Sequence, residues 1–204
     1  METHADEYVT IRGRTEAALT VRGSRFLALA APVVMRDGCE AEIRAARGRY
    51  HDATHHCYAY RLGPDGAQFR AHDDGEPAGS AGRPILAVID GAGLLGVIVV
   101  VTRYFGGTKL GVGGLARAYR DASALAVARA ERTTRVVCSL LGVSFPHACV
   151  GPVMRAVAAA GGRVSSAKYD SAVEMEIEIR TSRLEELRSA LLERTSGEIR
   201  FSRE

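Results

Sequence analysis

The amino-acid sequence predicts an α+β protein of two domains, residues 1–135 and residues 136–204. Three observations support this prediction. A chain of 204 residues is long enough for two small domains. Strand-like runs alternate with amphipathic stretches through the first domain. The second domain shows the order strand, helix, strand, strand, helix, strand, which is typical of a ferredoxin-like fold.

The first domain opens with short strands and one helix. β-branched and apolar residues dominate three runs separated by glycines, which predicts strands at 8–11, 17–21 and 26–30. Residues 39–50 place apolar side chains among charged ones at helical spacing. This pattern predicts an amphipathic helix.

A hairpin and a buried strand follow. Residues 54–62 predict a strand that turns at a Gly-Pro-Asp-Gly sequence and pairs with residues 68–70. Residues 97–102 are continuously apolar, as expected of a strand covered on both faces. The other expected elements are a loop at 73–84, a short helix from residue 85 and a long helix at 113–132.

The second domain has clear helix and strand signals. Residues 172–180 alternate apolar and charged side chains, which indicates a half-buried strand. Gly161 stands where a helix C-cap is expected, and Ser182 with Glu185 three positions later predicts a capping box. The remaining elements are strands at 137–145, 163–169 and 198–202 and a helix at 149–160.

Composition excludes the disordered and membrane-spanning classes. Apolar residues make up 47% of the chain and charged residues 25%, as in globular proteins. The apolar stretch at residues 26–35 is too short to span a bilayer, and the acidic residues Glu2, Asp6 and Glu7 stand where a signal peptide is basic. We therefore expect no membrane partner, a cytoplasmic location and four free cysteine thiols.

The most informative segment joins the strand at 97–102 to the longest helix. A glycine-dense loop lets backbone N–H groups approach a ligand, and the helix start adds unpaired donors and a partial positive charge. This order of elements predicts an anion site. The residues assigned to this anion or nucleic-acid site are Arg103, Tyr104, Gly106, Gly107, Lys109, Gly113, Gly114, Arg117 and Arg120.

The spacing of the loop does not identify the anion. No Gly-Lys-Ser/Thr follows four variable residues, and no acidic residue completes a dinucleotide fingerprint. Eight basic and three acidic residues give residues 83–135 a net charge of +5, which indicates a phosphate-bearing partner. The alternative is that the glycines serve a tight turn and close packing, and that the arginines cover a solvated helix face.

An acidic loop forms a second candidate surface. It comprises Arg61, Asp73, Asp74, Glu76 and Arg83. Neighbouring carboxylates shift each other's pKa and can act as general acid and base, so a phosphate-handling or hydrolytic enzyme is the alternative function. The same carboxylates can instead cap a helix or pair with Arg61, Arg83 or Arg103.

Histidines and a cysteine near the acidic loop carry weaker signals. His56 and Cys57 are adjacent on a strand, so their side chains point to opposite faces and do not form a nucleophile–base pair. His51, His55 and His72 are not accompanied by a Cys-x-x-Cys pair, so they do not complete a characteristic zinc motif. We therefore expect no catalytic residue, no metal and no cofactor.

Four sequence blocks resemble the signature of the YigZ/IMPACT family. They are Ser24 to Ala28, Asp52 to Arg61, Asp73 to Pro84, and Thr102 to Tyr119 with its Arg-Tyr-Phe-Gly-Gly and Lys-Leu-Gly sequences. Their order and spacing also fit, and residues 136–204 resemble the small second domain of bacterial members. The chain is identified as a member of this family over essentially its whole length.

The resemblance implies a fold and a role. The first domain should be an α/β sandwich like that shared by a small-subunit ribosomal protein domain and the GHMP kinases, and the second should resemble an elongation-factor domain. Eukaryotic relatives regulate the response to amino-acid starvation through protein contacts and associate with ribosomes. These likenesses imply a non-enzymatic regulator of translation that binds RNA, a ribosomal surface or a protein in a stress pathway.

Overall fold

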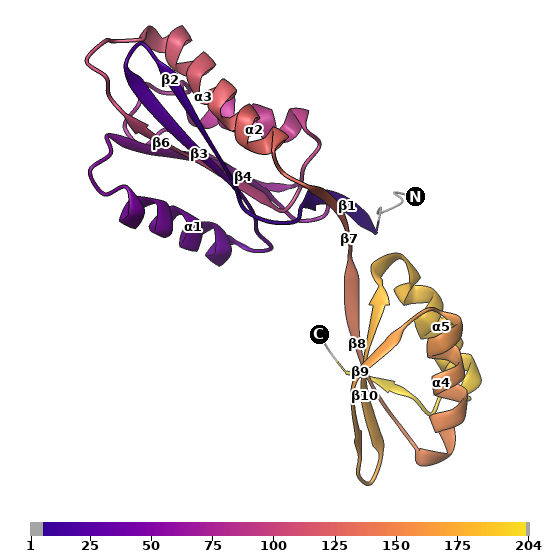
Figure 1. The fold of residues 1–204 in the computed structure, drawn as a ribbon. Helices are drawn as coiled ribbons and strands as arrows, with labels where there is room; N and C mark the ends of the chain where they lie inside the picture. The colour runs from indigo at the N-terminus through magenta and orange to yellow at the C-terminus, as the bar shows by residue number, and fades with distance from the viewer. Residues whose placement is uncertain (1–5, 203–204) are drawn as a thin grey trace. The chain divides into compact units, whose positions relative to one another are not determined.

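The structure is a computed structural model that describes residues 6–202 (Figure 1). Residues 1–5, including Glu2, and residues 203–204 lie outside the described part. The elements are β1 (Glu7–Ile11), β2 (Thr15–Val21), β3 (Ser24–Pro32), α1 (Arg36–Arg49), β4 (His55–Leu62), β5 (Gln68–His72), α2 (Gly82–Gly91), β6 (Val97–Tyr104), α3 (Gly111–Ala128), β7 (Arg132–Val136), β8 (Cys138–Phe145), α4 (Val150–Ala159), β9 (Arg163–Tyr169), β10 (Val173–Arg180), α5 (Leu184–Arg194) and β11 (Arg200–Phe201). Among the described residues, no helix has the length and apolar character needed to cross a membrane.

The chain divides into two compact units. One unit comprises Tyr8–Arg135, and the other comprises the residues from Val136 onward together with Asp6 and Glu7. The backbone N–H of Val137 donates to the Asp6 carbonyl oxygen over 2.6 Å. This contact explains why the described chain start groups with the second unit, although the sequence assigns it to the first domain. The mixture of helices and sheets confirms the predicted α+β, two-domain fold class.

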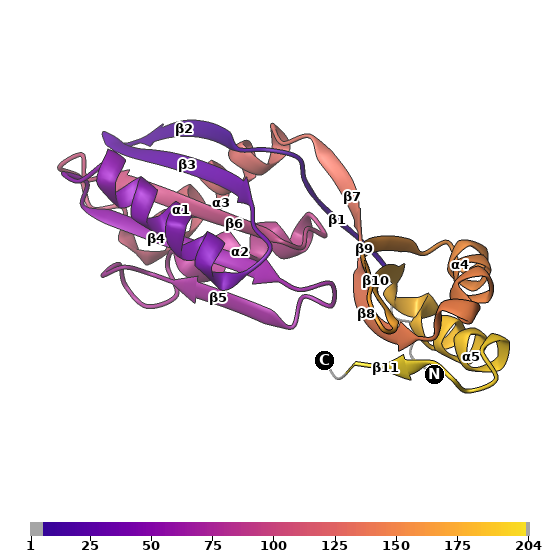
Figure 2. The same cartoon turned by 90° about the horizontal axis from the view of Figure 1, so that it is seen from below.

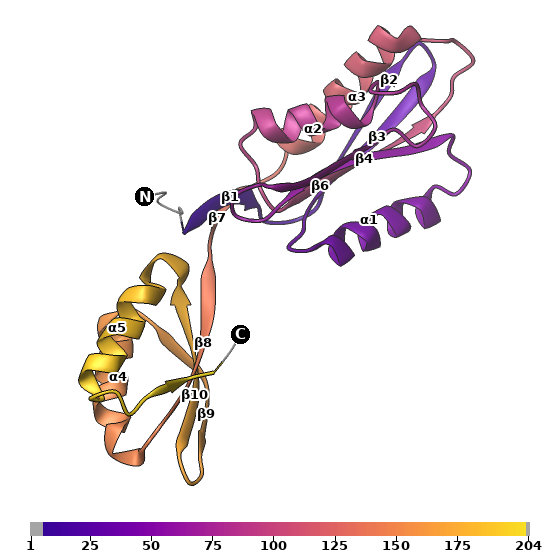
Figure 3. The same ribbon diagram turned by 180° about the vertical axis from the view of Figure 1, so that it is seen from behind.

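The first unit contains a five-stranded antiparallel sheet in the order β2-β3-β6-β4-β5. Helices α2 and α3 cover one face, and α1 lies on the other (Figures 1 and 3). β6 is the central strand. Its Val99 and Val101 belong to the core under α2 and α3, and Ile98 and Val100 belong to the core under α1. The continuously apolar strand predicted at 97–102 is confirmed, because both of its faces are covered.

Helix α3 is shorter than the sequence predicts. It ends at Ala128, and residues 132–136 form β7, which pairs with β1. The prediction that this helix continues to residue 132 is wrong. Pairing with the N-terminal strand accounts for the difference, since the N–H of Arg12 donates to the Glu131 carbonyl oxygen over 2.8 Å just before β7 begins.

The second unit has the predicted order β8-α4-β9-β10-α5-β11. Its four-stranded sheet has the order β11-β8-β10-β9, and α4 and α5 cover one face (Figure 2). Val173, Met175, Ile177 and Ile179 of β10 alternate into the core, while the glutamates between them lie on the other face. The predicted half-buried strand is confirmed.

The end of α4 agrees with the sequence. Gly161 has φ +70°, and its N–H donates to the Ala158 carbonyl oxygen over 3.0 Å. The N–H of Gly162 donates to the Val157 carbonyl oxygen over 2.9 Å. These two bonds form a Schellman motif, which confirms the predicted C-cap.

The start of α5 differs from the sequence prediction. Ser182 lies in a short 3-10 turn, Thr181–Arg183, and α5 begins at Leu184. The Ser182 hydroxyl donates to the Asp6 carboxylate, which also accepts the Ser182 N–H over 2.7 Å. The predicted capping box with Glu185 is wrong because the Ser182 hydroxyl and N–H both bind the Asp6 carboxylate instead.

Candidate functional site

The glycine loop, residues 105–114, leads into an open helix start. β6 ends at Tyr104 and α3 begins at Gly111, and Leu110 at the N-cap position makes no side-chain hydrogen bond to the helix. The first turn of α3 carries no acidic side chain. Its first N–H groups therefore lack a side-chain cap and stand at the positive end of the helix dipole.

Three basic residues lie along this segment: Lys109 two residues before α3, and Arg117 and Arg120 six and nine residues after its first residue. Lys109, Arg117 and Arg120 are all exposed. Arg117 and Arg120 are three residues apart and so lie on one side of α3. Arg120 forms an ion pair with Asp121 at 3.0 Å, whereas within residues 6–202 neither Lys109 nor Arg117 forms one. Two full positive charges at the loop are therefore uncompensated.

The glycines of the loop have different structural roles. A Cβ on Gly106 would lie 1.9 Å from the carbonyl carbon of Gly23, so only glycine fits where the loop passes the turn between β2 and β3. Gly107 has φ +85° and open space around it. A Cβ on Gly114 would lie 3.2 Å from the Leu110 Cβ, whereas a Cβ on Gly113 would meet nothing within 4 Å outside its own helix backbone. Close packing therefore explains why residue 106 is glycine, but it does not explain why residue 113 is glycine.

The two aromatic residues at the loop differ in exposure. Phe105 is 49% exposed, with the Arg103 guanidinium 5.6 Å from the centre of its ring. The Tyr104 hydroxyl donates to the Asp52 carboxylate over 2.7 Å, and the Arg25 guanidinium lies 4.9 Å from the centre of the Tyr104 ring. Phe105 is therefore the accessible aromatic side chain, and Tyr104 is held by its neighbours.

Arg103 is buried in the interior of the first unit. Its Nη1 donates to Glu76 Oε1 over 2.6 Å, and the two side chains are only 6% and 3% exposed. The guanidinium also lies 5.6 Å from the centre of the Phe26 ring. The structure thus does not bring Arg103 to the exposed surface of the glycine loop, because Glu76 already balances its charge inside the protein.

Hydrogen bonds join this ion pair to the glycine loop. The Tyr119 hydroxyl of α3 donates to Glu76 Oε1 over 2.7 Å. On the other side, Arg103 Nη2 donates to Ser24 Oγ over 3.5 Å, and the same oxygen accepts the N–H of Gly106 over 3.1 Å. The buried pair therefore connects the acidic loop, α3 and the first residues of the glycine loop.

Asp73 of the acidic loop caps a helix. It accepts the backbone N–H groups of Gly79, Ala81 and Gly82 over 2.8 to 2.9 Å, at the start of α2. Burial opposes the charged form, but these three donors outweigh it and hold the pKa of Asp73 below its ordinary value. The helix-cap alternative for this carboxylate is confirmed.

The remaining charged residues of the second candidate surface also have separate contacts. Asp74 accepts the Arg47 guanidinium and the His56 N–H, each over 2.7 Å. Arg61 pairs with Asp90 at 2.6 Å. The exposed Arg83 has no ion pair among the described residues. Of the three arginines that the sequence offers as partners, only Arg103 forms an ion pair with a carboxylate of the acidic loop among the described residues.

Cys57 and His56 point to opposite faces of β4, as the alternation of strand side chains predicts. The Cys57 thiol donates to the Asp73 carbonyl oxygen over 3.0 Å, and burial raises its pKa to about 12, so little thiolate exists at neutral pH. His56 Nδ1 lies 3.1 Å from Thr102 Oγ1. Among residues 6–202, no three His, Cys, Asp or Glu side chains are placed to hold a metal ion.

Both loops lie within a recognised domain. Residues 22–127 match the family described as Impact N-terminal domain, and residues 143–198 match a domain of unknown function, DUF1949. The chain belongs to the IMPACT family. This membership confirms the resemblance carried by the four sequence blocks, two of which form the acidic loop and the glycine loop.

Individual relatives agree with this family assignment. An IMPACT family member of Thermus thermophilus is 51% identical over 112 residues, which are 55% of this chain and 59% of that protein. The IMPACT family member YigZ of Escherichia coli is 30% identical over 89% of this chain and 90% of its own length. A crystal structure of a hypothetical protein superposes with a TM-score of 0.75 at 25% identity and covers 97% of both chains.

Sequence reasoning missed the residues that hold the two loops together. Tyr119 is 43 positions from Glu76, and Ser24 is 82 positions from Gly106. Neither residue type signals a buried hydrogen bond on its own. The family blocks around Tyr119 and Ser24 are the only signal in the sequence that singles these residues out.

Proposed function

We propose that this protein is a non-enzymatic binding module that binds RNA of the translation machinery through the glycine loop and the start of α3. One observation carries the proposal: the uncapped start of α3 lies in a segment with two exposed charges that form no ion pair among residues 6–202, Lys109 two residues before the helix and Arg117 six residues into it. Backbone N–H groups at a helix start and flanking cations are the donors that phosphate oxygens accept.

The exposed aromatic ring favours single-stranded RNA. Phe105 is half exposed directly after β6, four positions before Lys109 in the same loop. Base–aromatic stacking contributes on the order of 1–3 kcal/mol per base and requires an unpaired base. A duplex hides these base faces, so we expect it to bind more weakly than a single strand.

The contacts of the acidic loop support binding over hydrolysis. Glu76 is neutralised by Arg103 and accepts a hydrogen bond from Tyr119. Asp73 is a helix cap, and the raised pKa of Cys57 disfavours its thiolate. The alternative function, hydrolysis of a phosphate compound at this loop, would need one of these groups to leave its present partners.

Family membership supports a role in translation. The resemblance to eukaryotic IMPACT proteins implies regulation of the starvation response and association with ribosomes. The basic glycine loop is the surface of the first unit that suits ribosomal or messenger RNA. We accordingly place the protein in the cytoplasm, where such RNA is available, with no membrane partner.

Titration of labelled RNA tests the proposal. Fluorescence anisotropy with single-stranded and double-stranded RNA of unrelated sequence is compared for wild type, Lys109→Ala and Arg117→Ala at two salt concentrations. We expect weaker binding by both variants and a preference for single strands. Unchanged affinity in both variants, or no binding at low salt, overturns RNA as the ligand and makes a protein partner the better candidate. If the protein hydrolyses a phosphoester and Asp74→Asn abolishes this activity, the alternative function as a hydrolytic enzyme is favoured.

A further inference from the structure

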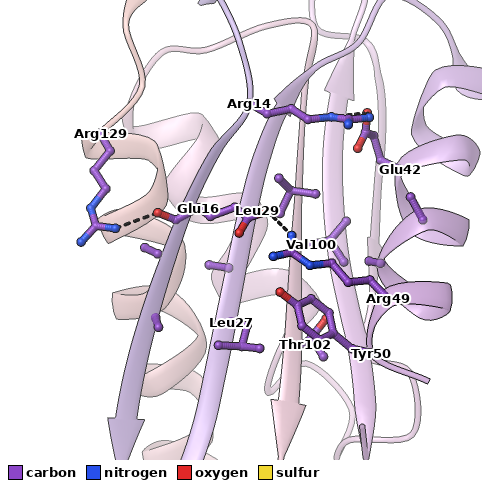
Figure 4. Close-up of a pocket in the computed structure, with 15 residues that line it drawn as sticks. Arg14, Glu16, Leu27, Leu29, Glu42, Arg49, Tyr50, Val100, Thr102 and Arg129 are labelled. Carbon is purple, nitrogen blue, oxygen red and sulfur yellow. Dashed lines mark hydrogen bonds and ion pairs between the residues drawn. The ribbon is translucent and has the colours of Figure 1, made fainter. Parts of the chain in front are cut away.

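A pocket of about 350 Å³ opens in the first unit between α1 and the sheet (Figure 4). Its floor is the outer face of the sheet, with the side chains of Leu27, Leu29 and Val100. The residues that line it include no residue of the glycine loop. A site here goes beyond the proposed RNA-binding function and can be tested independently of it.

The pocket exists because α1 covers only part of the sheet and the side chains at its border are small. α1 packs against β4 and β6, while Leu27 and Leu29 on β3 remain half-buried. Ala18 of β2 and Ala45 of α1 line the opening and are both exposed. Alanine at these positions leaves an apolar surface that a small molecule can cover, and the volume lies at the lower end of the range for ligand pockets.

Charged side chains surround this apolar floor. Arg14 pairs with Glu42 at 2.6 Å, and Arg49 reaches from α1 to the Glu16 carboxylate on β2 (Figure 4). Arg129 donates to the backbone carbonyl oxygen of Glu16 over 2.7 Å and so balances no carboxylate. The lining thus contains three arginines and two glutamates, a net charge of +1.

We propose that this pocket binds a small amphipathic monocarboxylate, with its apolar body on the floor and its carboxylate on Arg49. The guanidinium fork of arginine matches a carboxylate in two parallel hydrogen bonds. Arg49 and Glu16 are each more than half exposed, and such surface pairs are weak, so a ligand carboxylate can replace Glu16 at little cost. The two glutamates disfavour a dianion.

Three probes with one apolar body and different head groups test the charge preference. Octanoate, 1-octanol and octylamine are titrated into the full chain, and the methyl resonances of Leu27, Leu29 and Val100 are followed by NMR. We expect octanoate to bind most tightly, on the order of millimolar, and octylamine most weakly, because the lining carries a net positive charge. Equal or tighter binding of octylamine, or shifts that leave these methyl groups unmoved, overturns the proposal.

Two variants and a matched control locate the site. Arg49→Gln should weaken octanoate binding roughly fivefold and leave 1-octanol binding unchanged. Ala18→Phe fills the opening from an exposed position and should abolish binding of both. Arg36→Gln removes an exposed arginine that also pairs with a glutamate on α1, outside the pocket, and should bind octanoate like wild type. Wild-type octanoate affinity in both Arg49→Gln and Ala18→Phe contradicts the assignment.

Discussion

Arg103 Nη1 lies 2.6 Å from Glu76 Oε1, and both side chains are more than nine-tenths buried. Two segments that the sequence presents as separate surfaces, the acidic loop and the strand before the glycine loop, therefore share one buried ion pair. Tyr119 adds a third element, since its hydroxyl donates to the same carboxylate oxygen. The geometry of the exposed loop depends on a charge pair beneath it.

Glu76→Gln should lower the free energy of unfolding by about 3–5 kcal/mol. The substitution leaves the Arg103 guanidinium buried without its counter-charge, and removal of one partner of a buried pair is much more costly than removal of both. Urea denaturation measures the effect.

The double variant Glu76→Gln with Arg103→Met is the control. Because it removes both charges of the pair, it should lose much less stability than the sum of the two single variants. A loss below about 1 kcal/mol in Glu76→Gln would contradict a structural role for the pair.

Two glycines of the loop should respond oppositely to alanine. Gly106→Ala should lower the free energy of unfolding by about 1–3 kcal/mol, because its Cβ would overlap the Gly23 backbone. Gly113→Ala should raise it by up to about 1 kcal/mol, because the position is helical and open. The same Cβ stands beside the N–H groups of the helix start, so Gly113→Ala should also weaken RNA binding. Urea midpoints and RNA titrations together check both outcomes.

Full RNA affinity in a stable Gly113→Ala variant would show that the N–H groups of the first turn of α3 do not bind phosphate. The glycine would then serve only the flexibility of the loop before folding. In that case the side chains of Lys109, Arg117 and Arg120 would remain the candidates for phosphate contact in this segment.

Local patterns in the sequence were sufficient for most of the fold. The apolar run at 97–102 and the alternation of residues 173–180 each report burial within a few residues, so the strands could be predicted. The end of α3 and the start of α5 could not be predicted from local patterns. Both depend on contacts with the chain start, where β1 pairs with β7 and the Asp6 carboxylate binds Ser182.

The candidate site was predictable where its residues act alone. The sequence assigned Lys109 to the loop and Arg117 to the helix that follows it, and both are exposed at these positions; their role in binding stays a prediction. The buried position of Arg103 could not be predicted. No local pattern in the sequence distinguishes Glu76 from Asp73 or Asp74 as the partner of Arg103. That choice is made by the packing of the acidic loop against the sheet, which a single sequence does not encode in any local pattern.

The free energy of unfolding should fall between pH 7 and pH 5.5 partly through His56. Burial lowers the pKa of His56 in the folded state, and the nearby Asp74 carboxylate opposes this effect without overcoming it. The unfolded chain takes up the proton at a pKa of about 6.5. Stability from the neutral imidazole is therefore complete above pH 6.5 and is lost as the pH falls toward the lowered pKa.

His56→Gln should reduce this pH dependence, because glutamine can still bond the Thr102 hydroxyl but does not titrate. Urea denaturation at pH 7, 6.5, 6 and 5.5 gives the comparison. His51→Gln, at an exposed histidine five positions earlier, is the matched control and should follow wild type. An identical decline in wild type and His56→Gln would place the titrating group elsewhere.

Lys109→Ala and Arg117→Ala should each weaken RNA binding about equally for unrelated sequences. A phosphate contact carries no sequence information, and its loss should reduce the slope of log affinity against log salt by roughly one unit. Phe105→Ala should cost about 1–3 kcal/mol of binding free energy for single strands and little for duplex, because only unpaired bases stack. Fluorescence anisotropy at several salt concentrations measures all three variants.

Arg44→Ala is the matched control for these titrations. Arg44 is an exposed helical arginine like Arg117, but it lies on α1, across the sheet from α3 (Figure 1). If RNA binds through diffuse positive charge alone, Arg44→Ala should weaken binding as much as Arg117→Ala does, since the two variants change the net charge equally. If the helix start is the site, Arg44→Ala should keep wild-type affinity and salt slope. An equal effect of the two arginines would therefore exclude the glycine loop as a localised site even if RNA binds.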